Sequence, residues 1–325
     1  MNPIHNKSYR IALFAALIAL SVTACKKDNT DSNSIDTDTT SGATTSSPFD
    51  QNGASHATFS VAQGKYVHFS MGNLQFSTAG SHLTIDGSEA TGTFRFALHQ
   101  YDYIGDSNAN VSDSYEGFID LLCWGSSGWH VSPCSEKDGD YDIESLTENE
   151  SYADWGVFNA ISNGGNTANK WRTLSCDEWN YLTNERLTST VDGVENARYA
   201  EATVCNVVGL ILLPDNFLRP AATDSIKNIN ANNFGLSYSD NIYNDTSWAL
   251  MEQAGAIFLP AAGFRGGTGL SSIGDGGSYW ASTCNQNGQA YALLFIDGLV
   301  NAQAECTYEK DRGYGRSVRL VKDAD

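Results

Sequence analysis

The alternation of apolar and polar positions predicts mainly β-strands in the globular part of the chain. Strands are expected over 59–76, with a break at 71–73, and over 93–98. The segment 101–154 is instead rich in Asp, Ser, Gly and aromatic residues, which indicates long ordered loops. The glycine-dense segment 263–277 lacks the Lys-Ser/Thr pair of a phosphate loop, so we interpret it as an irregular surface loop.

A first helix is predicted just after Leu174 by its capping residues. Ser175 and Glu178 have the spacing of a capping box, in which each side chain accepts a hydrogen bond from the other residue's backbone amide. Leu174 and Trp179 occupy the flanking positions of a hydrophobic staple, and Leu182 continues the buried face one turn later. The two adjacent acids in the first turn are explained by the helix macrodipole, so we assign them no catalytic role.

A second helix is expected over 247–253, with Asp245 or Thr246 as its N-cap and Gly255 as its stop. The apolar segment 256–260 that follows is interpreted as a buried strand. These are the two main helices that the pattern predicts.

The last fifty residues predict a hairpin and a closing strand. Strands are expected over 279–282 and 290–296, and Asp297-Gly298 between apolar runs is typical of a two-residue hairpin turn. A terminal strand over 317–321 closes the domain. On the return strand of the hairpin a small apolar face alternates with a polar face, formed by Val300, Ala302 and Ala304 against Asn301, Gln303 and Glu305.

The amino-terminal end has the pattern of a secretory signal. Lys7 and Arg10 precede an apolar run over 11–20, which is shorter than the roughly 20 residues that a membrane span needs. Residues 1–24 are therefore expected to form a signal peptide. Small residues lead to Cys25 in a pattern that resembles a lipobox, in which the cysteine thiol takes a diacylglycerol. The alternative is an ordinary cleaved signal that happens to contain a cysteine.

The segment 25–56 consists mainly of Ser, Thr, Asp, Asn and Gly. Its apolar surface is too small to offset the entropy of ordering it. A lipidated Cys25 followed by a disordered tether is expected, and as a random coil the tether spans roughly 30 Å. One folded domain is then expected over 57–325. Residues 26–28 also resemble the charged tag that directs some lipoproteins to the outer face of the outer membrane, so a lipid-anchored position facing the cell exterior is expected.

The chain is strongly acidic, with 19 Lys and Arg against 38 Asp and Glu. Binding to a phosphate backbone relies on a basic surface, so a nucleic-acid partner is not expected. The membrane is expected as a partner only through the lipid anchor. A simpler explanation of the acidity is that the net charge keeps the protein soluble at a crowded cell surface.

Six cysteines besides Cys25 permit up to three disulfides in an oxidising compartment, and their pairing does not follow from the sequence. Cys284 with Cys306 is a candidate because both belong to neighbouring strands. Neither the cysteines nor the six histidines show zinc-finger spacing, and the segment 106–110, Asp-Ser-Asn-Ala-Asn, is followed by Val111 where a calcium loop needs glycine and lacks its final glutamate, so no metal or cofactor is expected. The six cysteines besides Cys25 are Cys123, Cys134, Cys176, Cys205, Cys284 and Cys306.

Seven segments in order resemble one family of proteins. They are 66–76, 102–106, 163–166, 171–175, 211–215, 258–263 and 315–321. Together they resemble the FISUMP-type major paralogous domain family of bacterial surface lipoproteins, over roughly residues 57–325. The resemblance implies an α+β, C-type-lectin-like fold related to the formylglycine-generating enzymes, with twisted antiparallel strands, two main helices and long loops.

The wider group includes the variable target proteins of diversity-generating retroelements, whose ligand-binding residues lie in a C-terminal segment that ends in a fixed last strand. This implies a candidate ligand-binding segment over 279–325. The polar and aromatic residue types there suit adaptable recognition, although singly they are explained by solubility. The candidate binding residues are Asn285, Asn287, Gln289, Asn301, Gln303, Glu305, Tyr308, Asp311 and Tyr314.

The expected function is therefore that of a surface-displayed adhesin or receptor that binds an extracellular protein or glycan, not that of an enzyme. The reactive cysteines of the related enzymes have no counterpart near residues 318–321, and the calcium-lectin motifs Glu-Pro-Asn, Gln-Pro-Asp and Trp-Asn-Asp are absent from the chain. The alternatives are a divergent oxidase using Cys284 and Cys306, a glycan hydrolase using acids such as Asp275 and Asp297, and a fibre or pilus tip subunit.

Overall fold

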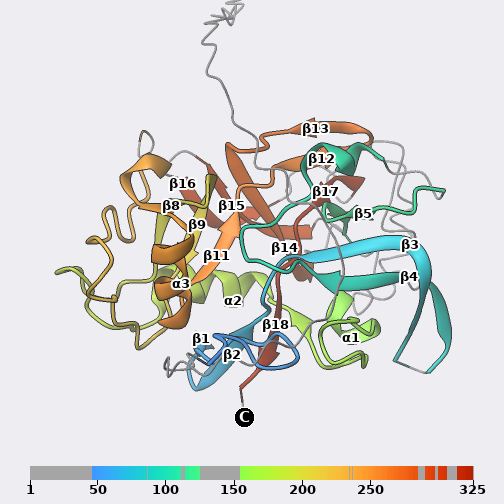
Figure 1. The fold of residues 1–325 in the computed structure, drawn as a ribbon, viewed down its shortest axis with the longest axis horizontal. Helices are drawn as coiled ribbons and strands as arrows, with labels where there is room; N and C mark the ends of the chain where they lie inside the picture. The colour runs from blue at the N-terminus through green and yellow to red at the C-terminus, as the bar shows by residue number, and fades with distance from the viewer. Residues whose placement is uncertain are drawn as a thin grey trace, which may run out of the picture. The chain divides into compact units, whose positions relative to one another are not determined.

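The folded part of the chain begins at Ser46 and is built mainly from antiparallel sheets (Figure 1). The computed structural model describes residues 46–324 except 86, 111–113, 125–153, 234, 236, 285–289, 297–298 and 306–312, and of 284 and 301–305 it describes the backbone alone. Within these residues, no helix is both long and apolar enough to cross a membrane.

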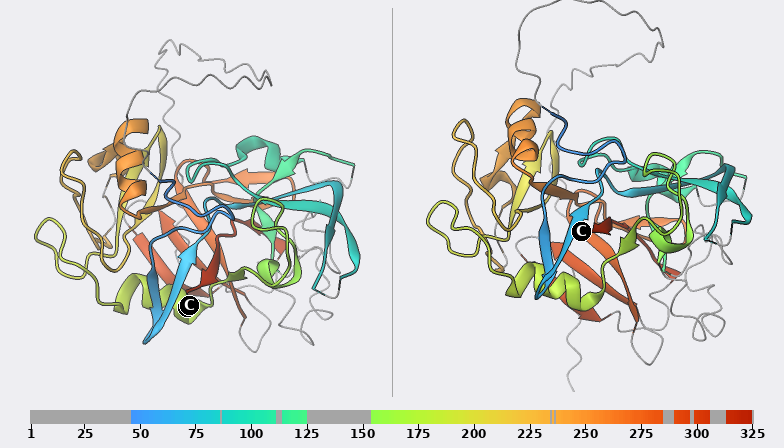
Figure 2. Two further views of the ribbon diagram at one scale, coloured as in Figure 1. Left: turned by 60° about the horizontal axis from the view of Figure 1, so that its bottom comes forward. Right: turned by 90° about the horizontal axis from the view of Figure 1, so that it is seen from below.

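The two ends of the folded part meet in one sheet, which joins β1 (Phe59–Ala62), β2 (Lys65–Phe69), β18 (Leu320–Asp323) and β7 (Arg172–Thr173). The last strand, β18, is hydrogen-bonded on both sides, with Val321 opposite Phe69 and Leu320 opposite Thr173. Figure 2 shows these strands beside the C-terminus, with α2 next to them. The closing strand expected over 317–321 thus begins later, at Leu320, and β17 (Gly315–Arg316) precedes it.

Two sheets frame the first half of the domain and its middle. One has the order β4 (Glu89–Phe96), β3 (Leu74–Leu83), β5 (Phe118–Ile119). The other has the order β10 (Ile242–Tyr243), β8 (Tyr199–Val204), β9 (Val207–Leu212), β11 (Ile257–Pro260), of which the β10–β8 pair is parallel. Strands over 59–76, 93–98 and 256–260 are therefore confirmed, with boundaries shifted by a few residues.

The late residues form two more sheets. One is β14 (Gly276–Cys284), β15 (Ala290–Ile296) and β16 (Leu299–Glu305), in which Ile296 opposite Leu299 confirms the expected hairpin pairing around 297–298. The other has the order β13 (Gly269–Ser271), β12 (Phe264–Gly266), β17 and β6 (Leu122–Cys123). The interpretation of 263–277 as an irregular loop is wrong, because β12 and β13 form a hairpin and β14 begins at Gly276.

The helices are few in the described part of the chain. They are α1 (Trp155–Phe158), α2 (Cys176–Asn180), which continues into a π-helical turn at Tyr181–Glu185, and α3 (Asp245–Gln253), with 3-10 turns at Gly105–Ala109 and Tyr238–Asp240. The capping box of Ser175 and Glu178 is confirmed at α2, and Trp179 and Leu182 are buried as expected.

The start of α3 corrects the expected helix. The N-cap is Asn244, not Asp245 or Thr246, because its side chain accepts from the Ser247 amide while the Ser247 hydroxyl accepts from the Asn244 amide. Gly255 ends the helix region with a φ of +91°, a conformation that glycine adopts without steric cost.

The folded part also begins earlier than residue 57. Asp50 accepts hydrogen bonds from the Asn52 and Ala54 amides, which closes a tight turn. The Ser55 amide then donates to the Phe69 carbonyl at 2.9 Å, so the segment is tied to β2. Ala54 and Ser55 are buried as a result. Polar composition predicted a tether up to 56, but local side-chain bonds order its last eleven residues.

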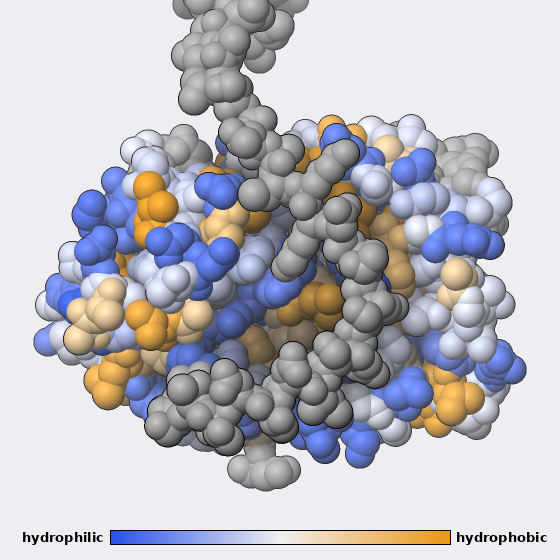
Figure 3. Space-filling model, in the orientation of Figure 1, coloured by the Kyte–Doolittle hydropathy of each residue, from blue (hydrophilic) through white to orange (hydrophobic). Residues whose placement is uncertain are grey.

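The core is formed by three clusters of buried side chains. One lies between α2, the strands β1 and β2 and one face of β14–β16, and a second lies on the other face of that sheet. The third lies between α3 and the β8–β9–β11 sheet. On the face in view in Figure 3, other hydrophobic side chains are dispersed among hydrophilic ones, as is normal for a protein surface.

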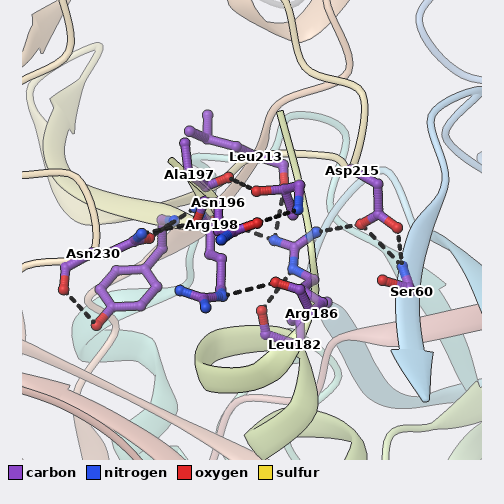
Figure 4. Close-up of polar contacts among 11 residues, drawn as sticks. Ser60, Leu182, Arg186, Asn196, Ala197, Arg198, Leu213, Asp215 and Asn230 are labelled. Carbon is purple, nitrogen blue, oxygen red and sulfur yellow. Dashed lines mark hydrogen bonds and ion pairs between the residues drawn. The ribbon is translucent and has the colours of Figure 1, made fainter. Parts of the chain in front are cut away.

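A buried guanidinium joins several of these elements (Figure 4). Arg186 donates to the carbonyls of Leu182, Arg198 and Leu213 and forms an ion pair with Asp215. Asp215 in turn accepts from the Ser60 amide in β1. The turn that follows α2 is thereby connected to β1 and to the end of β9.

Candidate functional site

The expected binding segment is supported by a sheet that is buried on both faces. Tyr279 and Leu293 belong to the cluster around α2, whereas Trp280 and Ala292 belong to the cluster on the other face. The Tyr279 hydroxyl donates to the Pro260 carbonyl at 2.8 Å, and the Trp280 indole donates to a carbonyl at 2.7 Å. The described middle of this sheet is therefore a rigid support, and exposed binding groups must come from strand ends and connecting segments.

Most of the expected binding residues lie outside the described side chains. Asn301, Gln303 and Glu305 lie in β16, of which the backbone is described. The register of β16 changes between residues 301 and 304, where one residue of β15 faces two of β16, so the expected two-residue alternation from 300 to 305 is interrupted. Outside the described residues lie Asn285, Asn287, Gln289, Tyr308, Asp311, the expected lipidation site Cys25, the Cys306 half of the possible disulfide and Asp297.

Tyr314 is the one expected binding residue whose side chain is described, and it lies in an aromatic cluster. It is partly exposed and meets Phe264 of β12 edge to face, with 5.8 Å between ring centroids. The guanidinium of Arg316 lies 4.9 Å from the ring of Trp280 and 5.8 Å from that of Phe264, and Arg316 donates to the Ser278 hydroxyl. A cation held over two aromatic rings fixes the backbone on which Tyr314 stands.

The neighbouring hairpin is fixed by a second buried arginine. Arg265 of β12 is fully buried and donates to the Leu121 carbonyl through Nη2 at 3.1 Å and to the Gly267 carbonyl at 2.9 Å. Burial raises the pKa of the Cys123 thiol beside it, and the positive charge of Arg265 opposes this. Sequence analysis missed this role, because the carbonyl acceptor of Arg265 lies 144 residues away.

A second candidate site, which the sequence did not predict, is a groove of about 560 Å³ beside α3. We call it the α3 groove. Its walls come from the segment 47–53, the loop 98–101 after β4, and one side of α3, with single residues from two other loops. The lining residues are Ser47, Pro48, Phe49, Asp50, Gln51, Gly53, Met71, Leu98, His99, Tyr101, Asn163, Asp245, Trp248, Ala249 and Glu252.

A cluster of three polar side chains adjoins this groove. Cys205 donates to the Asp245 carboxylate at 2.9 Å, and Tyr101 is hydrogen-bonded to Cys205. Burial and the Asp245 carboxylate raise the pKa of Cys205 to about 12, and burial with the same neighbours raises the pKa of Tyr101 to about 12. Both groups are therefore protonated at neutral pH, and Cys205 is unsuited to act as a nucleophile.

Cys205 also bears on the cysteine framework. It is free and occupies the two-residue turn between β8 and β9, where it and Asn206 have φ values of +49° and +68°. This is the backbone of a type I′ hairpin turn. Among the residues that the structure describes, Cys205 therefore forms no disulfide.

The Gln100 side chain fixes the loop that forms one wall of the groove. It donates to Glu252 at 2.9 Å and accepts from the Phe258 amide and from Arg319, each at 2.8 Å. Arg319 is fully buried, and burial lowers its pKa to about 10, so it stays cationic at neutral pH. The spacing of Asp245, Trp248 and Glu252 could have predicted one face of a helix, but not the loops that face it.

No metal centre is found in the part of the chain that the structure describes, where no three His, Cys, Asp or Glu residues are grouped to hold an ion. Asp275, one of the acids considered for glycan hydrolysis, is exposed, and its backbone carbonyl accepts from the Tyr238 hydroxyl at 2.8 Å.

In the comparisons with known proteins, the chain matches no family model, no curated protein and no solved structure.

Proposed function

We propose that this protein is a ligand-binding lipoprotein of the bacterial surface, anchored through Cys25, that binds an extracellular protein or glycan through residues 279–325. The proposal includes a C-type-lectin-like arrangement of the FISUMP type, which goes beyond the α+β, mainly antiparallel architecture described above. It rests on the sequence resemblance and on the way the late strands are held.

One observation carries the proposal: the backbone is fixed on both sides of every segment that holds candidate binding residues. Cys284 pairs with Ala290 across 285–289, and Glu305 at the end of β16 pairs with Tyr291 just before 306–312. After 306–312 the chain enters β17, where Gly315 is opposite both Cys123 and Arg265. A rigid scaffold holds the connecting segments in place, so their residues can differ in order to bind different ligands without disturbing the core.

The chemistry at the described edge of this frame supports recognition. Tyr314 and Phe264 are partly exposed, and aromatic side chains bury large area on binding at low entropy cost. The acidic chain favours ligands without a strongly negative surface. These features suit a protein or glycan ligand.

The binding face is tested by replacing Asn301, Glu305, Tyr308 and Asp311 with alanine together in the full chain. The variant is compared with the wild type on protein and glycan arrays, and we expect loss of the wild-type signals. The matched control replaces the same four residue types elsewhere, at exposed positions: Asn184, Glu195, Tyr66 and Asp177. Full binding by the first variant, with both variants folded by circular dichroism, would place the binding site elsewhere.

The anchor is tested separately. Cells that express the wild type are expected to incorporate a labelled fatty acid into the protein, and Cys25→Ser is expected to lose the label. If Cys25→Ser keeps the label, the lipobox interpretation is wrong.

Diversification of residues 279–325 by a retroelement predicts a near-duplicate of the 3′ end of the gene beside a reverse transcriptase gene.

The divergent oxidase, one of the alternative functions, is tested by the state of two cysteines near the C-terminus. Free thiols at Cys284 and Cys306, found by labelling the native protein, would favour the divergent oxidase, and a disulfide between them would disfavour it. For a glycan hydrolase or a fibre tip subunit, no arrangement among the described residues gives specific support.

A further inference from the structure

The α3 groove has one wall formed by a single face of a helix. Asp245, Trp248, Ala249 and Glu252 follow the i, i+3, i+4, i+7 spacing that places side chains on one side of a helix. Asp245 and Ala249 are exposed, and Glu252 is half-buried. This face therefore offers two carboxylates, one at each end of an apolar floor.

The facing walls are largely apolar. Leu98 is 66% exposed although it is a large aliphatic residue, and it lines the groove together with Met71 and Phe49. Tyr101 adds an aromatic ring that is stacked on His99, with 5.2 Å between centroids. An exposed leucine inside a concave and partly aromatic surface is typical of a site that receives an apolar group.

The charge of the groove has one sign. Its lining includes three carboxylates, those of Asp50, Asp245 and Glu252, and includes neither lysine nor arginine. His99, which also lines the groove, is paired with Asp102 at 3.0 Å, and the buried Arg319 outside the lining is bonded to Gln100. Burial raises the pKa of Glu252, and Gln100 and Arg319 oppose that shift only in part. A cation beside this carboxylate would offset its lost hydration.

We propose that the α3 groove binds a small organic cation, an ammonium or guanidinium group carried on an apolar body. The cationic group is attracted by the carboxylates of Asp245 and Glu252 at the two ends of the floor, and the apolar body lies against Leu98 and the Tyr101 ring. The site is independent of the C-terminal face, because none of its lining residues belongs to 279–325.

The test uses three probes with one body and different charge: 2-phenylethylamine, 2-phenylethanol and 3-phenylpropionate. Their binding to the intact protein is measured by equilibrium dialysis at low ionic strength. We expect saturable binding of the amine at least tenfold tighter than that of the alcohol, and no measurable binding of the carboxylate. Equal binding of amine and alcohol, or no saturable binding of the amine, overturns the proposal.

Two variants locate the site. Asp245→Asn with Glu252→Gln keeps the shapes of the side chains and is expected to reduce the affinity for the amine to that for the alcohol, while the alcohol binds as before. The control Asp177→Asn changes an exposed acid in the first turn of α2 and is expected to change nothing. A preference for the amine that survives the double variant overturns the assignment of the carboxylates.

The apolar wall is tested with Leu98→Ser, which is expected to weaken binding of the amine and of the alcohol by the same factor, at least threefold. Its control is Leu187→Ser, because Leu187 is another exposed leucine and lies outside the groove. Unchanged binding in Leu98→Ser, with the fold intact by circular dichroism, contradicts the placement of the apolar body.

Discussion

Arg186 and Asp215 form an ion pair of 2.8 Å in which the guanidinium is fully buried and the carboxylate is partly exposed. Burial lowers the pKa of Arg186 to about 10, and Asp215 opposes that shift, so the charge is kept at neutral pH. Three backbone carbonyls accept hydrogen bonds from the other nitrogen atoms of the guanidinium, as Figure 4 shows. The pair therefore holds the turn after α2 against β1 and the end of β9.

We predict that Asp215→Ala lowers the free energy of unfolding by about 3–5 kcal/mol, because it leaves a buried guanidinium without its counter-charge. Urea unfolding followed by circular dichroism measures the loss. Arg186→Met combined with Asp215→Ala is expected to recover part of it, since the buried charge is then absent. A loss below about 1 kcal/mol in Asp215→Ala, the size expected of an exposed pair, would contradict this role.

A second prediction concerns pH and Asp120. This carboxyl is fully buried, and burial raises its pKa to about 6, although bonds from Asn108 and the Ile104 amide oppose the shift. Because the folded pKa lies above the unfolded one, the stability contributed by the protonated carboxyl is present below about pH 4 and is lost as pH rises through about 6. The loss is of the order of 3 kcal/mol.

The measurement compares the wild type with Asp120→Asn, which cannot titrate at this position. The difference between their unfolding free energies is expected to change between pH 4 and about 6.5, with the wild type relatively more stable at the acidic end. Asp154, whose pKa burial also raises to about 6, acts in the same direction and stays present in both proteins. A difference that does not vary with pH would show that Asp120 is ionised throughout.

The sequence was most informative where structure depends on near neighbours. Ser175 and Glu178 are three residues apart, and their capping box was predictable because both partners are local. The cap of α3 was misplaced by one or two residues because Ser247, rather than Glu or Gln, accepts the hydrogen bond from the Asn244 amide. A less common pair of capping residues was therefore enough to shift the predicted start of α3.

Distant partnerships could not be predicted. The β12–β13 hairpin lies in a glycine-rich segment, and Arg265 fixes it through the carbonyl of Leu121. The α3 groove likewise depends on Leu98 and Phe49 meeting a helix about 150 or more positions later in the chain, which no periodicity encodes. Composition also failed for residues 46–56, whose order depends on Asp50 and on pairing with β2.

A third prediction concerns Glu178, whose carboxylate does more than cap α2. It accepts from the Ser175 amide at 2.8 Å and from both terminal nitrogens of Arg172, at 2.7 and 2.9 Å. We expect Ser175→Ala to cost about 1 kcal/mol, the usual value for a lost N-cap. Glu178→Ala is expected to cost about 2–3 kcal/mol, because a charge-assisted bidentate pair is lost as well.

Thermal and urea unfolding of the two variants measure these values. The control is Asp323→Ala, since Asp323 is the other acid bonded to Arg172 but is 70% exposed, and its loss should cost less than about 1 kcal/mol. Equal costs for Ser175→Ala and Glu178→Ala would show that the Arg172 pair adds nothing to the cap.

The last prediction concerns the reactivity of Cys205. This thiol is only partly buried, so access alone would permit alkylation, but burial and the Asp245 carboxylate raise its pKa to about 12. Because the thiolate is the reacting species, alkylation by iodoacetamide at pH 8 is expected to be more than about tenfold slower than for a cysteine in an unfolded peptide. Asp245→Asn removes the negative charge that destabilises the thiolate and is expected to accelerate the reaction, whereas Asp177→Asn is not. Peptide-resolved mass spectrometry follows the rate at Cys205 in each protein, and a rate in the wild type equal to that of the unfolded peptide would show that the carboxylate does not control this thiol.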